Sequence, residues 1–177
     1  MRGVLLARVG PVAVSGGFAV ALFVSTYENK VDKKGRVSVP AAFRKALEGE
    51  SFDGIYCFEH LSKPCIQGGG QSYIEMLQSA IEQVFDPLTD DQDDFATTLL
   101  SGSTPLALDG DGRVTLTKDL IETGGFGETV VFVGMGDSFE IWEPKSFAEH
   151  RAHARRRAAE KRALLLRPRK APEGGTA

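Results

Sequence analysis

The chain has 177 residues, a formal net charge of −3 and 42% hydrophobic residues, which suits one ordinary domain or two small ones. Its two cysteines exclude a disulfide-rich scaffold, and its apolar runs fall well short of the about 20 residues of a membrane span. Charge is unevenly distributed: residues 25–48 carry six Lys or Arg against three acids, residues 49–144 three against eighteen, and residues 145–177 ten against three. Positive charge is therefore concentrated near the start and in the tail.

Residues 1–21 are apolar, contain two arginines and faintly resemble a secretory signal, with Ala19 and Ala21 at the spacing of a cleavage site. The following residues have the character of an intracellular protein. We therefore favour a disordered extension or a wrongly assigned start codon for this segment.

A strand is predicted over residues 22–27, and a tight turn with a second strand over residues 31–39. Gly35 supplies the positive φ that such a turn requires. Pro40 falls where a helix begins, because proline is tolerated at the first helical position. The glycines at 49–54 end this helix.

A hairpin is expected next, with strands over residues 55–58 and 65–67. Cys57, His60 and Cys65 have a spacing that suggests metal binding, but a closed zinc site needs four ligands and no fourth is nearby. We expect no metal site here, and we interpret Cys57 as a buried thiol of a strand.

The centre of the chain predicts helices. The glycines at 68–70 lack the Gly-Lys-Ser/Thr ending of a phosphate-binding loop, so that interpretation is discarded. Over residues 71–85 the apolar residues recur at helical spacing. Thr89 or Asp90 can cap a following acidic helix. Together these helices form a connector between two similar regions.

The second of these regions begins near Thr104. Its segment 109–112 has the glycine and aspartate pattern of a calcium loop but lacks the later ligands. Thr117 is the expected N-cap of a helix over residues 118–123, and strands are predicted over 129–133 and 138–142. Pro144 begins a last helix that continues into the basic tail. Such a run is usually a solvated face, with nonspecific DNA affinity as the alternative.

The sequence contains a tandem duplication. VDKKGRVSVPAAF at residues 31–43 recurs as LDGDGRVTLTKDL at residues 108–120, after a shift of 77 residues. In each copy an aspartate precedes an arginine by four residues across the glycine turn, so its carboxylate can bind turn amides or orient the guanidinium. A purely structural pair of turns is the alternative interpretation.

We divide the chain accordingly into an extension (1–21), a first repeat (22–68), a helical connector (69–103), a second repeat (104–148) and a basic helical or disordered tail (149–177). Two repeats of this size bury little surface separately, so they are expected to share one core.

The doubled Asp-x-x-x-Arg turn, the opening LFVSTYENKVDKKGRVSVPAAFR, the closing VVFVGMGDSFEIWEPKSF and the acidic connector together resemble the MraZ family of bacterial transcriptional regulators. That family is built from two SpoVT/AbrB-type half-domains, and the resemblance covers roughly residues 22–150. It implies an α+β fold in which the two repeats form a swapped-hairpin, double-psi-like β-barrel. It also implies ring-shaped homo-oligomers that bind short direct repeats of double-stranded DNA upstream of the division and cell-wall gene cluster.

Transferred to this sequence, the resemblance implies that arginines and lysines of the turns contact DNA while the aspartates and glycines support them. The implied DNA contacts are Arg36, Lys34, Lys33 and Arg113, and the implied turn supports are Asp32, Asp109, Gly35 and Gly112. The second turn has Gly110 and Asp111 where the first has its lysines, so Arg113 lies in a less positive setting.

No enzymatic activity is expected, because the histidines His60, His150 and His153 show no grouping with a nucleophile, acid or metal ligand. Neither a cofactor nor a membrane partner is expected, and the resemblance implies a cytoplasmic, nucleoid-associated protein. The alternative is an oligomeric interaction module, or an antitoxin-like protein of the same fold whose turns bind protein.

Overall fold

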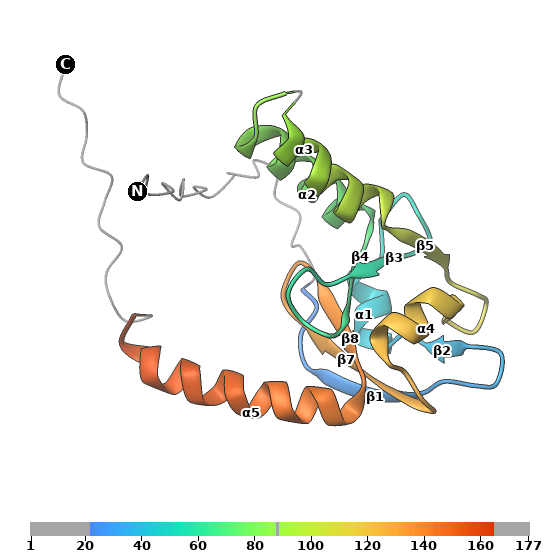
Figure 1. Ribbon diagram of the computed structural model, residues 1–177. Coiled ribbons are helices and arrows are strands. Elements are labelled where there is room, and N and C mark those ends of the chain that lie inside the picture. Colours follow the sequence, from blue (N-terminus) through green and yellow to red (C-terminus); the bar gives the residue numbers. More distant parts are fainter. Residues whose placement is uncertain (1–21, 88, 165–177) are drawn as a thin grey trace, which may run out of the picture. The chain divides into compact units, whose positions relative to one another are not determined.

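The structure is a computed structural model that describes residues 22–87 and 89–164 (Figure 1). The chain divides into a body that ends at Pro144 and a C-terminal unit that starts at Lys145, and each is described by itself. The elements of the body are β1 (Thr26–Lys30), β2 (Arg36–Ser38), α1 (Ala41–Ala46), β3 (Gly54–Glu59), β4 (Ile66–Gly69), α2 (Gln71–Val84), α3 (Asp90–Phe95), the π-helical segment η1 (Ala96–Ser101), β5 (Thr104–Ala107), β6 (Arg113–Thr115), α4 (Lys118–Gly124), β7 (Thr129–Gly134) and β8 (Phe139–Trp142).

The body is a mixed α+β fold with two antiparallel sheets. Six strands form a large sheet in the order β1-β7-β8-β4-β3-β5, and β2 pairs with β6 in a separate two-stranded ladder. Pro105 lies in β5, an edge strand of the large sheet, where the missing amide hydrogen of proline is tolerated. The hydrogen bonds of the described residues leave the two sheets separate, so the closed barrel stays a prediction.

The two repeats exchange their first strands. By the 77-residue shift β1, β2 and α1 correspond to β5, β6 and α4, and each of these elements has its counterpart near the expected position. Yet β1 pairs with β7 of the second repeat, β5 pairs with β3 of the first, and β4 pairs with β8 between them. Neither repeat therefore has a complete sheet of its own.

One hydrophobic core joins both repeats. Phe43 of α1 is fully buried and lies against the rings of Tyr27, Phe132 and Phe139, with ring centroids 5.4, 6.2 and 5.4 Å away. The last two rings belong to the second repeat, so α1 packs on strands from both halves. The shared core expected from the size of the repeats is confirmed by this cluster.

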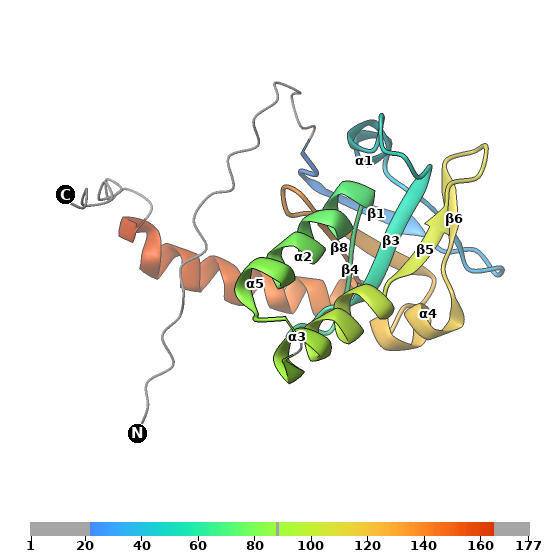
Figure 2. The ribbon, with the colours of Figure 1, turned by 90° about the horizontal axis from the view of Figure 1, so that it is seen from above.

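The connector helices cover a second, smaller cluster. Its buried members are Phe58 of β3, Tyr73 and Ile81 of α2, and Leu99 of η1. The helix predicted over 71–85 is confirmed at Gln71–Val84. The cap at Thr89 is confirmed as well, since its side chain accepts a hydrogen bond from the backbone of Gln92 at 3.3 Å. α2 and α3 lie above the sheet in Figure 1, and Figure 2 shows them side by side.

The C-terminal unit contains α5 (Pro144–Lys161) except its first residue, and a short 3-10 turn, η2 (Arg162–Leu164). The predicted start of this helix at Pro144 is confirmed. Its cationic side chains are exposed: Lys145, Arg151, Arg155, Arg156, Arg157 and Lys161. None of the helices within residues 22–87 and 89–164 is both long and apolar enough to cross a membrane.

Two local expectations differ from the structure. The first strand begins at Thr26 instead of residue 22, because Ser25 has a φ of 74° and interrupts the extended backbone. Phe23, before it, forms only an isolated bridge with Gly136. Pro40 lies at the N-cap of α1, one position before the first helical residue. The extension (1–21) and the end of the tail lie outside the described residues.

Candidate nucleic-acid interface

The first turn is held together by the side chain of Asp32. Its Oδ1 accepts hydrogen bonds from the backbone amides of Lys34 at 2.8 Å and Arg36 at 3.0 Å. Its Oδ2 lies 2.7 Å from both Nε and Nη2 of Arg36. One carboxylate thus fixes the turn backbone and orients the guanidinium, the two tasks that its spacing predicted.

The second turn repeats this arrangement. Oδ1 of Asp109 accepts hydrogen bonds from the amides of Asp111 and Arg113, both at 2.9 Å, and Oδ2 accepts one from Nε of Arg113 at 3.0 Å. The difference is a second carboxylate: Oδ2 of Asp111 accepts a hydrogen bond from Nη2 of Arg113 at 2.5 Å. Arg113 is therefore bound by two acids, and Arg36 by one.

Glycine makes both turns possible. Gly35 and Gly112 have φ values of 78° and 71°, in the left-handed region that glycine adopts at little cost. A β-carbon on Gly35 would also lie 3.0 Å from the carbonyl oxygen of Leu116, so even a small side chain would strain the approach of the two repeats.

The bonds within each turn favour the ionised carboxylates. The hydrogen bond from Arg36 and the turn amides lower the pKa of Asp32 from 3.8 to about 2. The backbone amide of Arg113, followed by its side chain, lowers the pKa of Asp109, and the hydrogen bond to Asp109 raises the pKa of Arg113. The Asp–Arg pairs are thus fully charged at neutral pH.

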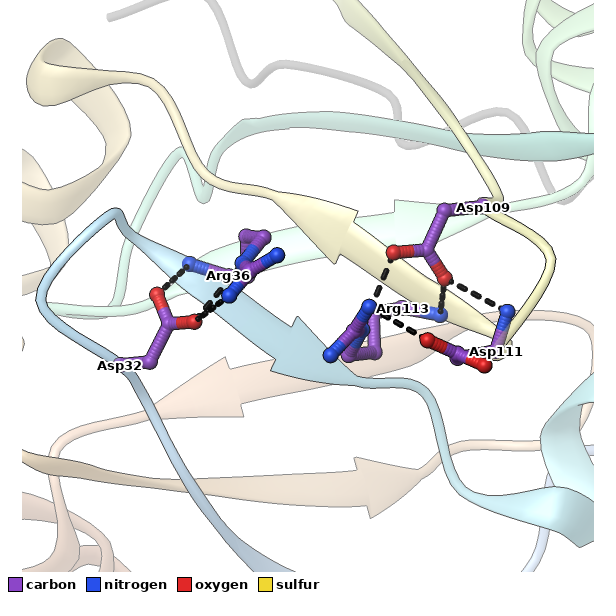
Figure 3. A network of polar contacts seen from close by, with 5 residues as sticks. All are labelled: Asp32, Arg36, Asp109, Asp111 and Arg113. Carbon is purple, nitrogen blue, oxygen red and sulfur yellow. Dashed lines mark hydrogen bonds and ion pairs between the residues drawn. The ribbon is translucent and has the colours of Figure 1, made fainter.

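The β2–β6 ladder brings the two turns onto one surface. Its register pairs Arg36 with Thr115, Val37 with Val114, and Ser38 with Arg113. Because directly paired residues point to the same face of a sheet and neighbours along a strand point to opposite faces, both arginines stand on one face and both valines on the other. Figure 3 shows the two Asp–Arg pairs side by side on this face.

Burial agrees with this alternation. Val37 and Val114 are 0% and 1% exposed, whereas the side chains of Arg36 and Arg113 remain 35% and 31% exposed. We use the name arginine face for the exposed side of the ladder, defined by Arg36, Ser38, Arg113 and Thr115. It presents two guanidinium groups that aspartates orient, while the valines on the opposite side of the ladder are buried in the core.

The two ends of the arginine face differ in charge. The first turn, residues 32–36, has one acid against three cations, including the exposed Lys33 and Lys34, and its net charge is +2. The second turn, residues 109–113, has two acids against one cation, and its net charge is −1. The difference noted in the sequence is therefore a difference between the two ends of one surface.

One neighbour of the second turn was missed by sequence reasoning. The side chain of Arg44, in α1 of the first repeat, lies over Gly112 so closely that a β-carbon there would clash with its Nη1. In the repeat alignment the counterpart of Arg44 is Ile121, so no motif marks this position.

Within residues 22–87 and 89–164, the cysteines and His60 do not come together as a metal-binding or reactive site. Cys57 and Cys65 are buried, and desolvation raises the pKa of each thiol to about 12, so neither forms a thiolate near neutral pH. His60 lies 3.6 Å from Glu140, which also binds Lys63 and Trp142. The described residues contain no group of three His, Cys, Asp or Glu side chains placed to hold a metal ion.

Comparison with known proteins identifies the family. Residues 22–80 and 99–167 match the family model of the MraZ protein, which is described as antitoxin-like. The chain is 40% identical over 144 residues to a transcriptional regulator MraZ of Pelagibacter ubique, covering 81% of this chain and 92% of that protein. It is 41% and 42% identical over 145 and 144 residues to proteins of the same name from Rickettsia bellii and Rickettsia akari, covering 81% of this chain and 96% of each.

The matched ranges contain both Asp-x-x-x-Arg turns and every strand of the two sheets. The match covers both turn motifs and the two ends of the helical connector, residues 69–80 and 99–103. The chain belongs to the MraZ family.

Proposed function

We propose that this protein is a transcriptional regulator that binds specific DNA sequences through the arginine face. The single observation that supports this most is the display of two Asp-oriented guanidinium groups on one exposed, core-anchored ladder. The names of the relatives, transcriptional regulator MraZ, support the same function.

The chemistry of the turns suits double-stranded DNA. An arginine in the major groove can bind O6 and N7 of guanine together, a contact that contributes about 1–3 kcal/mol of discrimination between bases. Arg36 is suited to this role because Asp32 already restricts its orientation. Lys33 and Lys34 are exposed on the same turn, where they can bind phosphates without reading the sequence.

The proposed fold is a swapped-hairpin, double-psi-like barrel in which the β2–β6 ladder bridges the two edges of the large sheet. Two observations support closure: the chain leads from the edge strand β1 into β2 and from the edge strand β5 into β6, and each of these pairs is in contact. The repeats would then span residues 22–68 and 104–148, joined by the connector 69–103.

The protein is further proposed to act as a ring of identical protomers on short direct repeats, upstream of the division and cell-wall gene cluster. A single arginine face is small and would bind weakly. When several arginine faces of one ring bind DNA repeats spaced about one helical turn apart (about 10–11 bp), the avidity can rise by roughly 10²–10⁴. This assignment implies a non-enzymatic protein of the cytoplasm that works at the nucleoid without a cofactor.

A second candidate is an oligomeric interaction module or antitoxin-like protein of the same fold, whose turns bind protein. The description of the matched family as antitoxin-like favours it. Both candidates use the same exposed turns, so the identity of the bound molecule distinguishes them.

A mobility-shift assay tests the proposal. The purified protein is mixed with DNA from immediately upstream of its own gene and with a scrambled fragment, across a series of salt concentrations. A discrete, salt-sensitive shift of the native fragment alone, lost in Arg36→Ala with the oligomer intact, is the expected result.

Three other results of this assay would contradict the proposal. Equal binding to both fragments would assign the affinity to nonspecific charge, such as that of α5. Absence of any shift, with capture of a co-encoded protein, would favour the interaction module. Dissociation of the oligomer in Arg36→Ala would mean that Arg36 is structural.

A further inference from the structure

The second turn receives a cation from the opposite repeat. Arg44 is on α1 of the first repeat, and its side chain crosses to the turn before β6. A β-carbon on Gly112 would clash with Nη1 of Arg44 and would lie 2.7 Å from both its Cδ and its Cζ. The stem and head of this arginine therefore lie directly on the glycine of the turn.

The backbone holds α1 and this turn together. The amide of Val39, just before α1, donates a hydrogen bond to the carbonyl oxygen of Gly112 at 3.0 Å. Arg44 also lines one surface cavity together with Asp109, Gly110 and Gly112. In Figure 2, α1 and the turn that leads into β6 lie at the same end of the body.

The equivalent position at the first turn is apolar. By the 77-residue shift Arg44 corresponds to Ile121 of α4, whose Cδ1 would lie 3.5 Å from a β-carbon on Gly35. The first turn carries its own lysines at positions 33 and 34 and has no cation from the opposite helix at this position. The second turn lacks lysines and has Arg44.

The guanidinium of Arg44 is available to a ligand. Arg44 is exposed, and within residues 22–87 and 89–164 it forms no ion pair with any acid at a distance of 4.0 Å or less. Glu48, Glu50, Asp53 and Asp109 line the same cavity, so the surroundings are acidic. An exposed cation in such surroundings is well placed to offset the repulsion between this end of the face and a DNA phosphate.

We propose that Arg44 is a DNA-phosphate contact that completes the second turn, so that each turn has a phosphate-binding cation beside its base-reading arginine. At the first turn these cations are Lys33 and Lys34 of the same repeat, and at the second turn the cation comes from the other repeat. This inference rests on the proposed function, because it names a further contact of the same DNA-binding surface.

The position of Arg44 suits a phosphate better than a base. Its guanidinium lies on Gly112, in the turn before β6, and not on a residue of the arginine face. A phosphate contact adds affinity on every sequence and contributes about one unit to the slope of log K against log salt concentration. Removing it should therefore weaken native and scrambled fragments alike.

The test compares Arg44→Gln, Arg44→Lys and Lys45→Gln with the unaltered full-length protein in the mobility-shift assay, on both fragments and over a salt series. Lys45 is the matched control, because it follows Arg44 in the last turn of α1 and contributes the same charge to that helix end. Thermal unfolding of each variant reports on folding.

The expected result is that Arg44→Gln lowers the salt slope by about one per bound protomer, while Arg44→Lys restores it and Lys45→Gln changes it less. If the unaltered protein binds its fragment but Arg44→Gln and Lys45→Gln behave alike, the role of Arg44 is overturned and the proposed function stands. A lower unfolding midpoint with an unchanged slope would make Arg44 structural and overturns the inference as well. If the unaltered protein binds no DNA, the proposed function fails and this inference fails with it.

Discussion

Val37 and Val114 are directly paired across the β2–β6 ladder, and both are buried in the shared core. A shift of either strand by one residue would move its valine into solvent and turn its arginine toward the core. The hydrophobic pair thus sets the register that keeps Arg36 and Arg113 exposed on one face.

Substitution of Asp32 tests whether this residue affects DNA affinity through its own charge or through the orientation of the Arg36 side chain. In Asp32→Asn, the carboxylate that binds Nε and Nη2 of Arg36 is lost, so the arginine gains rotamer freedom that DNA binding must remove. We expect specific affinity to fall about tenfold, although the removal of an acid makes the surface more positive.

The control for this prediction is Glu28→Gln, which removes one exposed acid from β1 outside the turn. It should leave specific affinity unchanged or slightly higher. Measurement of both variants on the native and scrambled fragments gives the answer, and an equal effect of the two substitutions would show that Asp32 does not act through Arg36.

The titration of Asp32 gives a second prediction. Its pKa in the folded protein is about 2, below the ordinary 3.8, so the stabilisation from the Asp32–Arg36 pair is fully present above about pH 3.8. It is lost as the pH falls from 3.8 through 2, because the carboxylate must then bind a proton. In Arg36→Gln the pKa should rise toward 3.8, but remain below it, since the turn amides still bind Oδ1.

Carbon NMR of the Asp32 carboxyl group during an acid titration measures this difference directly. Identical Asp32 titration curves in the two proteins would show that the arginine does not hold the carboxylate in solution.

Asp111→Lys should convert the second turn to the pattern of the first. The substitution removes the acid that binds Nη2 of Arg113 and places a cation where the first turn has Lys34. We expect tighter binding to all DNA sequences, with a salt slope steeper by about one per bound protomer.

Asp137→Lys makes the same change of charge outside the ladder and is the matched control. If both variants tighten binding equally, net charge alone explains the effect. A gain confined to Asp111→Lys, measured by the salt series on native and scrambled fragments, would assign it to the second turn.

Truncation of Phe43 tests whether the repeats fold as one unit. Phe43 is fully buried against rings of both repeats, so Phe43→Ala should lower the free energy of unfolding by about 3–5 kcal/mol. Trp142 lies in β8 of the second repeat and reports from the other half.

In Phe43→Ala, the denaturant midpoints measured by Trp142 fluorescence and by backbone circular dichroism should shift by the same amount. Lys45→Gln, an exposed substitution on the same helix, should change the free energy by less than about 0.5 kcal/mol. Two separate transitions, with only one affected by Phe43→Ala, would show that the halves unfold independently.

Much of the local structure could be predicted from the sequence. Gly35 and Gly112 have the positive φ values that tight turns require, and Thr117 caps α4 by accepting a hydrogen bond from the amide of Leu120. These features depend on neighbouring residues along the chain, and a duplicated motif shows them twice. For the same reason, the Asp–Arg spacing indicated that each aspartate binds the turn amides and orients the arginine.

The exchange of first strands could not be derived from local pattern. The alternation within β1 does not distinguish β3 from β7 as its partner, because the two repeats offer similar strands. Arg44 was missed for a related reason: its neighbour Gly112 is distant in sequence and belongs to the other repeat. Contacts between the repeats depend on how the two repeats pack, and an alignment of the two copies does not reveal this packing.

Joining the two repeats in one chain gives each protomer a polarity. Two identical half-domains in a symmetric dimer would present identical turns, and such a surface has no direction along a duplex. Here one turn has a net charge of +2 and the other −1, and one helix contributes an arginine where its counterpart has an isoleucine. The ladder therefore has a head and a tail, and protomers that bind in sequence can all point the same way along the DNA.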